Sequence, residues 1–323
     1  MIVRWGISAF SRLIEDLSIE RPLLVTTRRW ADIDIPVVHR FDGVLPHAEI
    51  DGVHAASDAA TSADGLVALG GGSAIDTAKA VSMATGLRIV SIPTTYSGAE
   101  WTGSFGMRNP TTKIKEGGTG AKMTAILYET ELTLDLPGSE TAGTALNALA
   151  HCAEALYVTD VTDETATDAL TGAGIISSFL PIVLESPRSA SDRRALLVGA
   201  MHAGSALRAG MGIGHAMAQA LGGHFGLAHG TMNAICLPHA LRFNLPVASG
   251  PIGSLAAAMG TDDAIERVSE LASLAGSTRL RDYGVRREEL PAVASAAAER
   301  PAAKANPRPA PPEAVLELLE AAW

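Results

Sequence analysis

The sequence predicts two domains: an N-terminal α/β dinucleotide-binding domain with a parallel sheet, residues 1–137, and an all-helical C-terminal domain, residues 138–323. Three observations lead to this prediction. The chain has 323 residues, which favours two domains over one. Short apolar runs alternate with a helical pattern in the first part, as they do in βαβ units. Ala- and Leu-rich segments with helical spacing fill the second part.

The strands of the first domain are expected where apolar and β-branched residues form short runs. These runs are residues 21–27, 35–41, 65–70 and 87–95. Between the last two, residues 73–85 have the apolar spacing of a helix. A strand, a helix and a strand within about 30 residues form a βαβ unit, which implies a parallel sheet. The segment 125–137 closes this domain.

The second domain shows helical spacing from Gly138 to Phe225, with one interruption at "LESPRSASD". Two later segments, 264–276 and 311–323, place their apolar side chains on one face of a helix. Gly276 is the expected stop of the first of these helices. We therefore expect helices throughout this part of the chain.

Composition narrows the class of protein. The formal charge of −10 argues against a nucleic-acid partner, which needs a basic surface. Two cysteines form no disulfide framework, which favours the cytoplasm. The N-terminus has no basic segment followed by an apolar core, so we expect no secretory signal. The longest apolar run, "FLPIVL", is too short for a membrane span, so no membrane is expected as a partner.

A glycine-rich turn, "LGGGSAIDTAKA", follows the strand expected at residues 65–70. Gly71 and Gly72 let the backbone approach a ligand, and Ser73 is the expected N-cap of the next helix, which also carries Asp76. A helix N-terminus attracts anions, so the diphosphate of a dinucleotide fits there. The spacing is not G-x-G-x-x-G, and a tight turn without a ligand is the alternative.

Two other strand ends carry groups suited to a cofactor. "IPTTYSGAEWT" supplies the hydroxyls of Thr94, Thr95 and Ser97 where ligands bind in open α/β sheets, although a capped loop would look the same. The first strand ends in "VTTRRW", with Thr27, Arg28 and Arg29 and no acid for a ribose 2′-hydroxyl. Arginines hold phosphate well, which favours NADPH over NADH, unless these are surface arginines.

Four polar residues of the second domain have the spacing of a ligand site. Asn147 and His151 are four residues apart in "ALNALAHCAEALY", so they share one helix face. His215 and His229 are separated by 13 residues in the later segment "GHAMAQALGGHFGLAHG". Imidazole suits zinc or iron, but the anion that would hold a divalent ion is missing. The residues allow a metal site, a former metal site or a polar core.

The motifs "GGGSAIDTAKA", "PTTYSGAEWT", "NALAHCAEALY", "GHAMAQALGGHFGLAHG" and "LPHALRFN" resemble the iron-containing alcohol dehydrogenase superfamily, and most closely its maleylacetate reductase branch. The resemblance covers almost the whole chain. It implies the dehydroquinate synthase-like fold, a dinucleotide-binding domain before a helical domain, an active site in the cleft between them, hydride transfer with NADH or NADPH, and a homodimer. In metal-dependent members the positions of Asn147, His151, His215 and His229 carry one Asp and three His.

The departures from this pattern shape the functional prediction. Asn147 replaces the ligand Asp, as it does in the maleylacetate reductase branch, which is understood to work without a metal. Gln219 stands where both groups have His, and Gly214 and Gly230 replace other polar positions. We therefore expect a metal-independent NAD(P)H-dependent reductase of a carbonyl or enone, with His151 as a candidate proton donor. If a metal is present, His151, His215 and His229 are its expected ligands.

Other assignments remain open. The same residues fit a metal-dependent alcohol dehydrogenase, a cyclase or lyase built on the same scaffold, or a binding protein without activity. Maleylacetate is a dianion, and Arg208 and Arg242 are the candidate cations for such a small-molecule substrate. Lys113 matches a family lysine and is expected at the surface. His202, His224 and His239 are expected to be structural; His239, after Pro238, is expected to begin or cap a helix.

Overall fold

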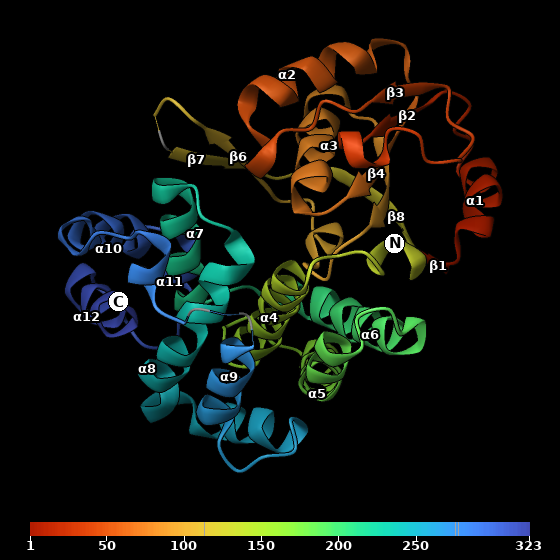
Figure 1. Ribbon diagram of the computed structural model, residues 1–323. Coiled ribbons are helices and arrows are strands. Elements are labelled where there is room, and N and C mark those ends of the chain that lie inside the picture. The colour runs from red at the N-terminus through yellow and green to blue at the C-terminus, as the bar shows by residue number, and fades with distance from the viewer. Residues whose placement is uncertain (113, 275, 277) are drawn as a thin grey trace. The chain divides into compact units, whose positions relative to one another are not determined.

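The computed structural model describes residues 1–112, 114–274, 276 and 278–323. It contains two compact units. The first comprises Met1–Thr95 and Ala99–Thr133, and the second comprises Tyr96–Gly98 and Leu134–Trp323. Figure 1 shows that the strands belong to the first unit and that the second is built from helices. Lys113 lies outside the described residues.

The first unit is built on a six-stranded parallel sheet, as the sequence predicts. Its strand order is β1-β8-β5-β4-β2-β3. The strands are β1 (Ile2–Trp5), β2 (Pro22–Val25), β3 (His39–Phe41), β4 (Gly65–Gly70), β5 (Arg88–Pro93) and β8 (Lys122–Tyr128). β2 and β4 are buried along their whole length, as is typical of a parallel sheet covered on both faces.

Alternation along the strands separates two apolar layers. Val67 and Leu69 of β4 pack with α1 (Phe10–Asp16) on one face. Leu66 and Ala68 pack on the other face with α2 (Ile50–Ala59) and α3 (Gly72–Thr85). Successive side chains of a strand point to opposite faces, so the continuous apolar run "LVAL" supplies both layers. The sheet is therefore held between helices, and its carboxyl edge is left for loops.

Some strands differ from the expectation. Of residues 35–41 only His39–Phe41 form a strand. Pro36 has no N–H for a ladder, and Arg40 donates to the carbonyl oxygens of Ile33 and Ile35, which keeps this segment out of the sheet. The sequence also gave no sign of the four-residue edge strand β1 or of the antiparallel hairpin β6 (Phe105–Asn109) and β7 (Ile114–Gly118).

The secondary-structure elements described in the second unit are all helices, joined by loops, in agreement with the sequence. Its helices are α4 (Gly138–Ala155), α5 (Asp163–Glu185), α6 (Ala190–Ala206), α7 (Ile213–Phe225), α8 (His229–Ala258), α9 (Ala264–Ser273), α10 (Leu290–Ala298), α11 (Pro301–Lys304) and α12 (Pro312–Ala322). Of the described helices, α5 alone is long and apolar enough to cross a membrane, with a mean hydropathy of 1.5. It packs against α4 and α6 within this unit.

His239 does not begin or cap a helix, contrary to the expectation. It lies within α8, which runs from His229 to Ala258 and contains Pro238. A proline inside a helix removes one backbone hydrogen bond and crowds the preceding turn. The helix nevertheless continues, because α8 packs against α4, α7 and α9. Packing of this kind outweighs local preference in long buried helices.

Candidate active site

Helix α4 carries three polar residues on one face of its Ala- and Leu-rich second half. Asn147, His151 and Glu154 follow one another at positions i, i+4 and i+7, and all three are buried. Ala and Leu surround them, so these side chains have few polar partners within their own helix. Their partners must come from other segments of the second unit.

The second unit brings the three predicted histidines together. His215 lies in the first turn of α7, and His229 is the first residue of α8. The rings of His151 and His215 are stacked, with centroids 4.3 Å apart and an interplanar angle of 18°. The rings of His215 and His229 are 5.9 Å apart and tilted by 53°. We call His151, His215 and His229, with the amides Asn147 and Asn233, the histidine cluster.

Two amides connect the cluster. Asn147 Nδ2 donates to the carbonyl oxygen of Ser97 at 2.9 Å and to His151 Nε2 at 3.0 Å. Asn233 Nδ2 donates to Asn147 Oδ1 at 2.6 Å and lies 3.1 Å from His229 Nε2. A carbonyl oxygen only accepts, so Ser97 fixes the orientation of Asn147, and Asn147 fixes that of Asn233. Nε2 of His151 and of His229 therefore accepts an amide hydrogen, and the ring proton of each lies on Nδ1.

Glu154 fixes His215 by accepting a hydrogen bond from the ring, whereas the amides donate to His151 and His229. His215 Nδ1 donates to Glu154 Oε2 at 2.6 Å, and the backbone N–H groups of Gly212 and Gly214 donate to the same carboxylate, each at 2.7 Å. The ring proton of neutral His215 is therefore on Nδ1, and its Nε2 carries a lone pair. A Cβ atom at Gly214 would lie 2.8 Å from Glu154 Oε1, so this glycine allows the carboxylate to approach.

Sequence reasoning missed Glu154 and assigned no role in the site to Asn233. Each has a helical signal: Glu154 continues the polar face of Asn147 and His151, and Asn233 is four residues after His229. The His229/Asn233 pair thus mirrors the Asn147/His151 pair. Gly230, which departs from the family pattern, has a packing role. Its Cβ would lie 2.5 Å from the carbonyl oxygen of Gly143, so α4 and α8 meet closely enough for the two amides to bond.

Three buried polar atoms of this region have no hydrogen-bond partner within the described chain. They are His151 Nδ1, His215 Nε2 and Asn233 Oδ1. An unpaired buried polar group costs about 1–3 kcal/mol, so several of them side by side require a reason. From the tautomers given above, they offer one N–H donor and two acceptors. This is the pattern expected of a ligand site whose ligand supplies the missing partners.

The cluster does not fit one shared metal ion in this arrangement. A metal must lie close to the plane of each ligating ring, about 2.0–2.1 Å from a bare nitrogen. The stacked planes of His151 and His215 cannot both contain such an ion. Nε2 of His151 and of His229 already accepts an amide hydrogen. Among the described residues, no three His, Cys, Asp or Glu side chains are placed to hold a metal together.

His151 is a neutral donor in this setting. Burial and the neighbouring His215 ring hold the pKa of His151 well below its ordinary value of 6.5. His151 therefore carries no positive charge near neutral pH. The neutral ring offers a hydrogen bond from Nδ1, and the expectation that His151 is the proton donor stays a prediction.

The first unit gathers most of the predicted cofactor residues at one edge of its sheet. Thr27 and Arg28 follow β2, Gly71–Ser73 follow β4, and Thr94 and Thr95 follow β5. These three strands are neighbours and parallel, so their carboxyl ends lie at the same edge. From β2 the chain goes to β3 on one side, and from β4 it goes to β5 on the other. Ligands of open α/β sheets bind at such a switch point.

The glycine turn has an open side. Gly70 has a φ of +147°, which favours glycine, and a Cβ at Gly71 would lie 2.9 Å from Thr95 Cγ2. A Cβ at Gly72 would meet nothing within 4 Å. The 14-residue helix α3 begins at Gly72 with its N-terminus at this turn. Backbone N–H groups and free space at a helix N-terminus suit a diphosphate.

Ser73 is not the N-cap, contrary to the prediction. The helix begins one residue earlier, and Gly71 is the cap residue because its carbonyl oxygen accepts from the N–H groups of Ala74 and Ile75. The hydroxyl oxygen of Ser73 instead accepts from the backbone N–H of His47 at 2.9 Å. Ser73 thus lies in the first turn, where its own hydroxyl hydrogen is available to a ligand.

Of the other predicted cofactor residues, Asp76 and Ser97 have partners within the protein, and Arg28 is exposed. Asp76 Oδ1 lies 3.4 Å from Lys79 Nζ, and its Oδ2 accepts from the N–H of Gly106 at 3.3 Å, so it has structural partners. Ser97 belongs to the second unit and gives its carbonyl oxygen to Asn147. Arg28 is exposed at the edge of the sheet.

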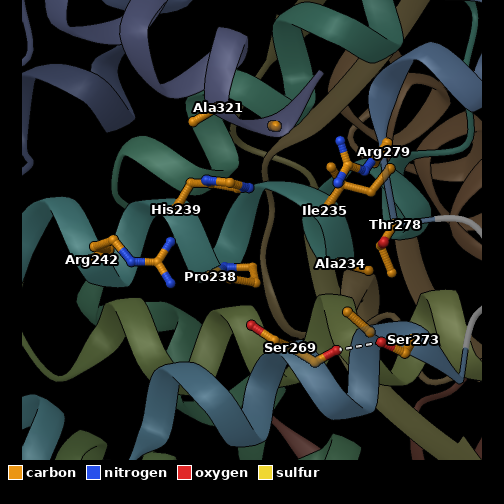
Figure 2. A pocket seen from close by; sticks show the side chains of 12 residues that line it. Ala234, Ile235, Pro238, His239, Arg242, Ser269, Ser273, Thr278, Arg279 and Ala321 are labelled. Atoms are coloured by element: carbon orange, nitrogen blue, oxygen red, sulfur yellow. Dashed lines mark hydrogen bonds between the residues drawn. The ribbon is translucent and has the colours of Figure 1, made fainter.

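The second unit also has an open hollow of about 290 Å³. Figure 2 shows Arg242, His239 and Arg279 around it, with Ser269 and Ser273 on the facing helix. None of the histidine cluster lines it. Arg208 donates to Glu164 at 2.9 Å. Of the two arginines suggested as substrate contacts, Arg242 therefore lines this hollow and Arg208 forms an ion pair with Glu164.

Known proteins resemble this chain over its full length. Residues 4–128 match the iron-containing alcohol dehydrogenase family, and residues 141–323 match its C-terminal region. Maleylacetate reductase of Pseudomonas knackmussii is 34% identical over 99% of this chain and 95% of its own length.

Solved structures show the same fold. That of maleylacetate reductase from Rhizobium sp. strain MTP-10005 has a TM-score of 0.90 and 29% identity, covering 100% of this chain and 95% of its own. Sulfoacetaldehyde reductase from Bifidobacterium kashiwanohense, solved with NAD+, shares the fold at 20% identity, with a TM-score of 0.89 and coverage of 100% and 96%. The α/β sheet, the helical unit and these matches together show that the chain belongs to the iron-containing alcohol dehydrogenase family.

Proposed function

We propose that this chain is a cytoplasmic, homodimeric NAD(P)H-dependent reductase, similar to maleylacetate reductases, that acts on a small carboxylated carbonyl or enone without a metal ion. The observation that carries the proposal is the pair of amides in the histidine cluster. Asn147 and Asn233 occupy Nε2 of His151 and His229 with amide hydrogens. The site therefore offers hydrogen-bond donors and acceptors where metal-dependent relatives are expected to hold an ion.

The carboxyl edge of the sheet is the proposed cofactor site. The first turn of α3, with Gly71, Gly72 and Ser73, suits the diphosphate, because backbone N–H groups and the helix dipole favour an anion there. Thr94 and Thr95 are proposed for the nicotinamide side. Exposed Arg28 is proposed to hold a 2′-phosphate, which favours NADPH over NADH. Sulfoacetaldehyde reductase, solved with NAD+, has the same fold and supports a dinucleotide here.

The reduction needs one hydride and one proton. The bound nicotinamide supplies the hydride to the carbonyl carbon, or to the β carbon of an enone, and becomes NAD(P)+. The substrate oxygen gains negative charge as the C–H bond forms and the π bond breaks. The Nδ1–H of neutral His151 is proposed to donate a hydrogen bond to this oxygen, which stabilises the developing charge. A proton taken up from solvent then reaches the oxygen, or the α carbon of an enolate, to give the alcohol or the saturated ketone.

A metal-dependent alcohol dehydrogenase is the second candidate. The observation in its favour is that all three histidines are kept and lie within one cluster. Against it, the stacked ring planes of His151 and His215 cannot share an ion, and Nε2 of His151 and of His229 already accepts an amide hydrogen. A cyclase or lyase on the same scaffold needs no net hydride transfer, so cofactor turnover separates it from both reductases.

The test combines turnover with metal analysis on one sample. Purified protein is treated with a chelator, and oxidation of NADPH and of NADH is followed with maleylacetate and with simple aldehydes. We expect turnover that the chelator leaves unchanged, with the best rate on the carboxylated substrate. A stoichiometric iron or zinc ion whose removal abolishes turnover would refute the metal-free part. Absence of cofactor oxidation with every substrate would refute the reductase.

A further inference from the structure

We propose that Glu154 is the positioning residue that makes His215, rather than His151, the group that exchanges a proton with the substrate. This rests on the proposed reductase function and refines its proton step. Sequence motifs did not point to Glu154, and the hydride step does not use it. Four hydrogen bonds fix the Glu154 carboxylate beside the histidine cluster.

The carboxylate is completely buried and is surrounded by donors. Oε2 accepts from His215 Nδ1 at 2.6 Å and from Gly212 N–H at 2.7 Å. Oε1 accepts from Gly214 N–H at 2.7 Å and, at 3.4 Å, from the N–H of His215. A buried carboxylate is tolerated when several donors satisfy it. Here the donors are the backbone and the ring of the α7 N-terminus, so Glu154 fixes both the position of His215 and its tautomer.

The glycines beside His215 fit this role. A Cβ at Gly214 would lie 2.8 Å from Glu154 Oε1, and a Cβ at Gly212 would lie 3.0 Å from Asn306 Oδ1 and 3.1 Å from Glu154 Oε1. Side chains at these positions would push the carboxylate away from the N–H groups that it accepts. The segment "GIGH" therefore supplies the backbone N–H groups that Glu154 accepts, and its two glycines leave room for the carboxylate. Gly214 departs from the reductase pattern, and the close approach of Glu154 accounts for it.

The stacked rings of His151 and His215 offer opposite groups to a ligand, a hydrogen-bond donor and an acceptor. The amide of Asn147 leaves His151 with a free N–H at Nδ1, whereas Glu154 leaves His215 with a free lone pair at Nε2. The rings are stacked with centroids 4.3 Å apart, so both can face one ligand. His151 Nδ1 already carries its hydrogen, whereas the bare Nε2 of His215 can take up a proton while Glu154 holds Nδ1 of the same ring. His215 can then give this proton to the reduced substrate, and in the reverse direction its lone pair takes the proton of an alcohol.

Nitrogen-15 NMR of the histidine rings in the wild-type protein tests the tautomer directly, with the His215 signals assigned through the H215N variant. In the resting protein we expect the His215 proton on Nδ1 and a bare Nε2. A proton on Nε2 with a bare Nδ1 would overturn the role of Glu154. This measurement requires neither turnover nor a folded Glu154 variant.

The E154Q variant tests the consequence for turnover. An amide cannot accept all four donors, so one orientation opposes a backbone N–H and the other turns an N–H toward His215 Nδ1. We expect a His215 tautomer that shifts toward Nε2–H and a kcat lower by about 100-fold, in the range of a lost general acid. The KM for NADPH should stay within about two-fold, because the cofactor residues are untouched.

The matched control is D168N. Asp168 Oδ1 accepts from His202 Nδ1 at 2.8 Å, so it is another histidine–carboxylate pair of the second unit, outside the histidine cluster. We expect D168N to change the His202 ring signals and to leave kcat within about two-fold. An E154Q protein with wild-type kcat, or one that loses kcat with the His215 tautomer unchanged, would overturn the proposal. A wild-type protein that oxidises no cofactor would refute the reductase function instead, whatever the tautomer.

Discussion

The histidine cluster in the helical unit and the carboxyl edge of the sheet in the α/β unit are built in opposite ways. The cluster consists of buried side chains that bond one another, through Asn147 and Asn233. The sheet edge consists of backbone and open space around Gly72. The histidine cluster depends on which atoms donate hydrogen bonds and which accept them, whereas the sheet edge depends on the lack of a side chain at Gly72. Mutations in the cluster should therefore alter stability and polarity, and mutations at the sheet edge should alter cofactor affinity.

Asn147→Asp should have the largest effect, because it changes the polarity of the whole cluster. A carboxylate cannot donate to the Ser97 carbonyl oxygen or to His151 Nε2, so both bonds are lost. We expect a free energy of unfolding lower by about 3 kcal/mol, as for a buried unpaired charge. The new carboxylate also leaves Nε2 of His151 bare, so zinc should raise the Tm of this variant and leave that of the wild type unchanged.

Asn244→Asp is the control for burying a carboxylate at an amide position. Asn244 and Asn306 form a buried amide pair, with bonds of 2.9 Å and 2.8 Å. This variant should lose stability without gaining a response to zinc. Thermal denaturation with zinc and with chelator measures both effects. If zinc stabilises the wild type as much as N147D, the two amides do not exclude a metal, and the metal-free proposal fails.

Gly72→Ala should affect the sheet edge without harming the fold. A Cβ at this position meets no protein atom within 4 Å, and alanine is the better helix former at the start of α3. The methyl group would instead take space proposed for the diphosphate. We expect a Kd for NADPH raised by about 10-fold, the size of one lost charge-assisted contact. Fluorescence titration measures it.

Gly250→Ala is the matched control, because its Cβ also meets nothing within 4 Å and it lies in α8, which belongs to the second unit. It should leave cofactor affinity unchanged. Equal Kd values for G72A and the wild type would show that the open side of the glycine turn does not hold the diphosphate.

Arg28→Gln should have a smaller effect, confined to the choice of cofactor. Arg28 is exposed, so water screens its interaction with a phosphate, and its loss should cost about 1 kcal/mol. We expect the preference for NADPH over NADH to fall by about five-fold. Arg29→Gln is the control, because its guanidinium lies over the Trp30 ring, 5.0 Å from the centroid. A ratio of kcat/KM values that Arg28→Gln leaves unchanged would remove Arg28 from the site.

The sheet edge could be predicted from local sequence patterns, whereas the histidine cluster could be predicted only from the family resemblance. The strand-glycine-helix pattern at Gly70–Thr85 and the parallel sheet followed from periodicity and turn chemistry, which are local properties. The gathering of His215 and His229 with α4 followed from the resemblance, because no local pattern states which helices pack together. The cap residue was wrong by two positions, since Gly71, unlike Ser73, had the extended conformation that a cap requires.

The details that decide the chemistry were beyond the sequence. Glu154 was part of the quoted segment "ALNALAHCAEALY", yet its role depends on the Gly212–His215 backbone, 58 to 61 residues later. The tautomers of His151 and His229 depend on a chain of amides that starts at the Ser97 carbonyl oxygen. A carbonyl oxygen has no sequence signature, because every residue carries one. The polar face of α4 was the available signal for Glu154, and it extended one turn further than the Asn147/His151 pair.

His239 provides the smallest test, because this half-buried histidine has no amide or carboxylate partner among the described residues. Burial, and then the neighbouring Arg242, lower the pKa of His239 from 6.5 to about 4. Between these values the unfolded chain binds a proton at His239 that the folded chain does not. The free energy of unfolding should therefore fall as pH decreases from 6.5, with the loss complete below about 4. Urea denaturation at several pH values measures this slope.

His239→Gln should reduce the slope over that range and leave the part that His151 contributes, whereas His54→Gln, at an exposed histidine of α2, should not reduce it. The comparison separates two ways of keeping an imidazole neutral. His239 is neutral because burial and a cation oppose its charge, so its protonation costs only stability. His151 is neutral in the cluster, beside His215, so its protonation would also remove the polarity on which the proposed reduction depends. A His239→Gln protein with an unchanged slope would place the acid-sensitive group elsewhere in the chain.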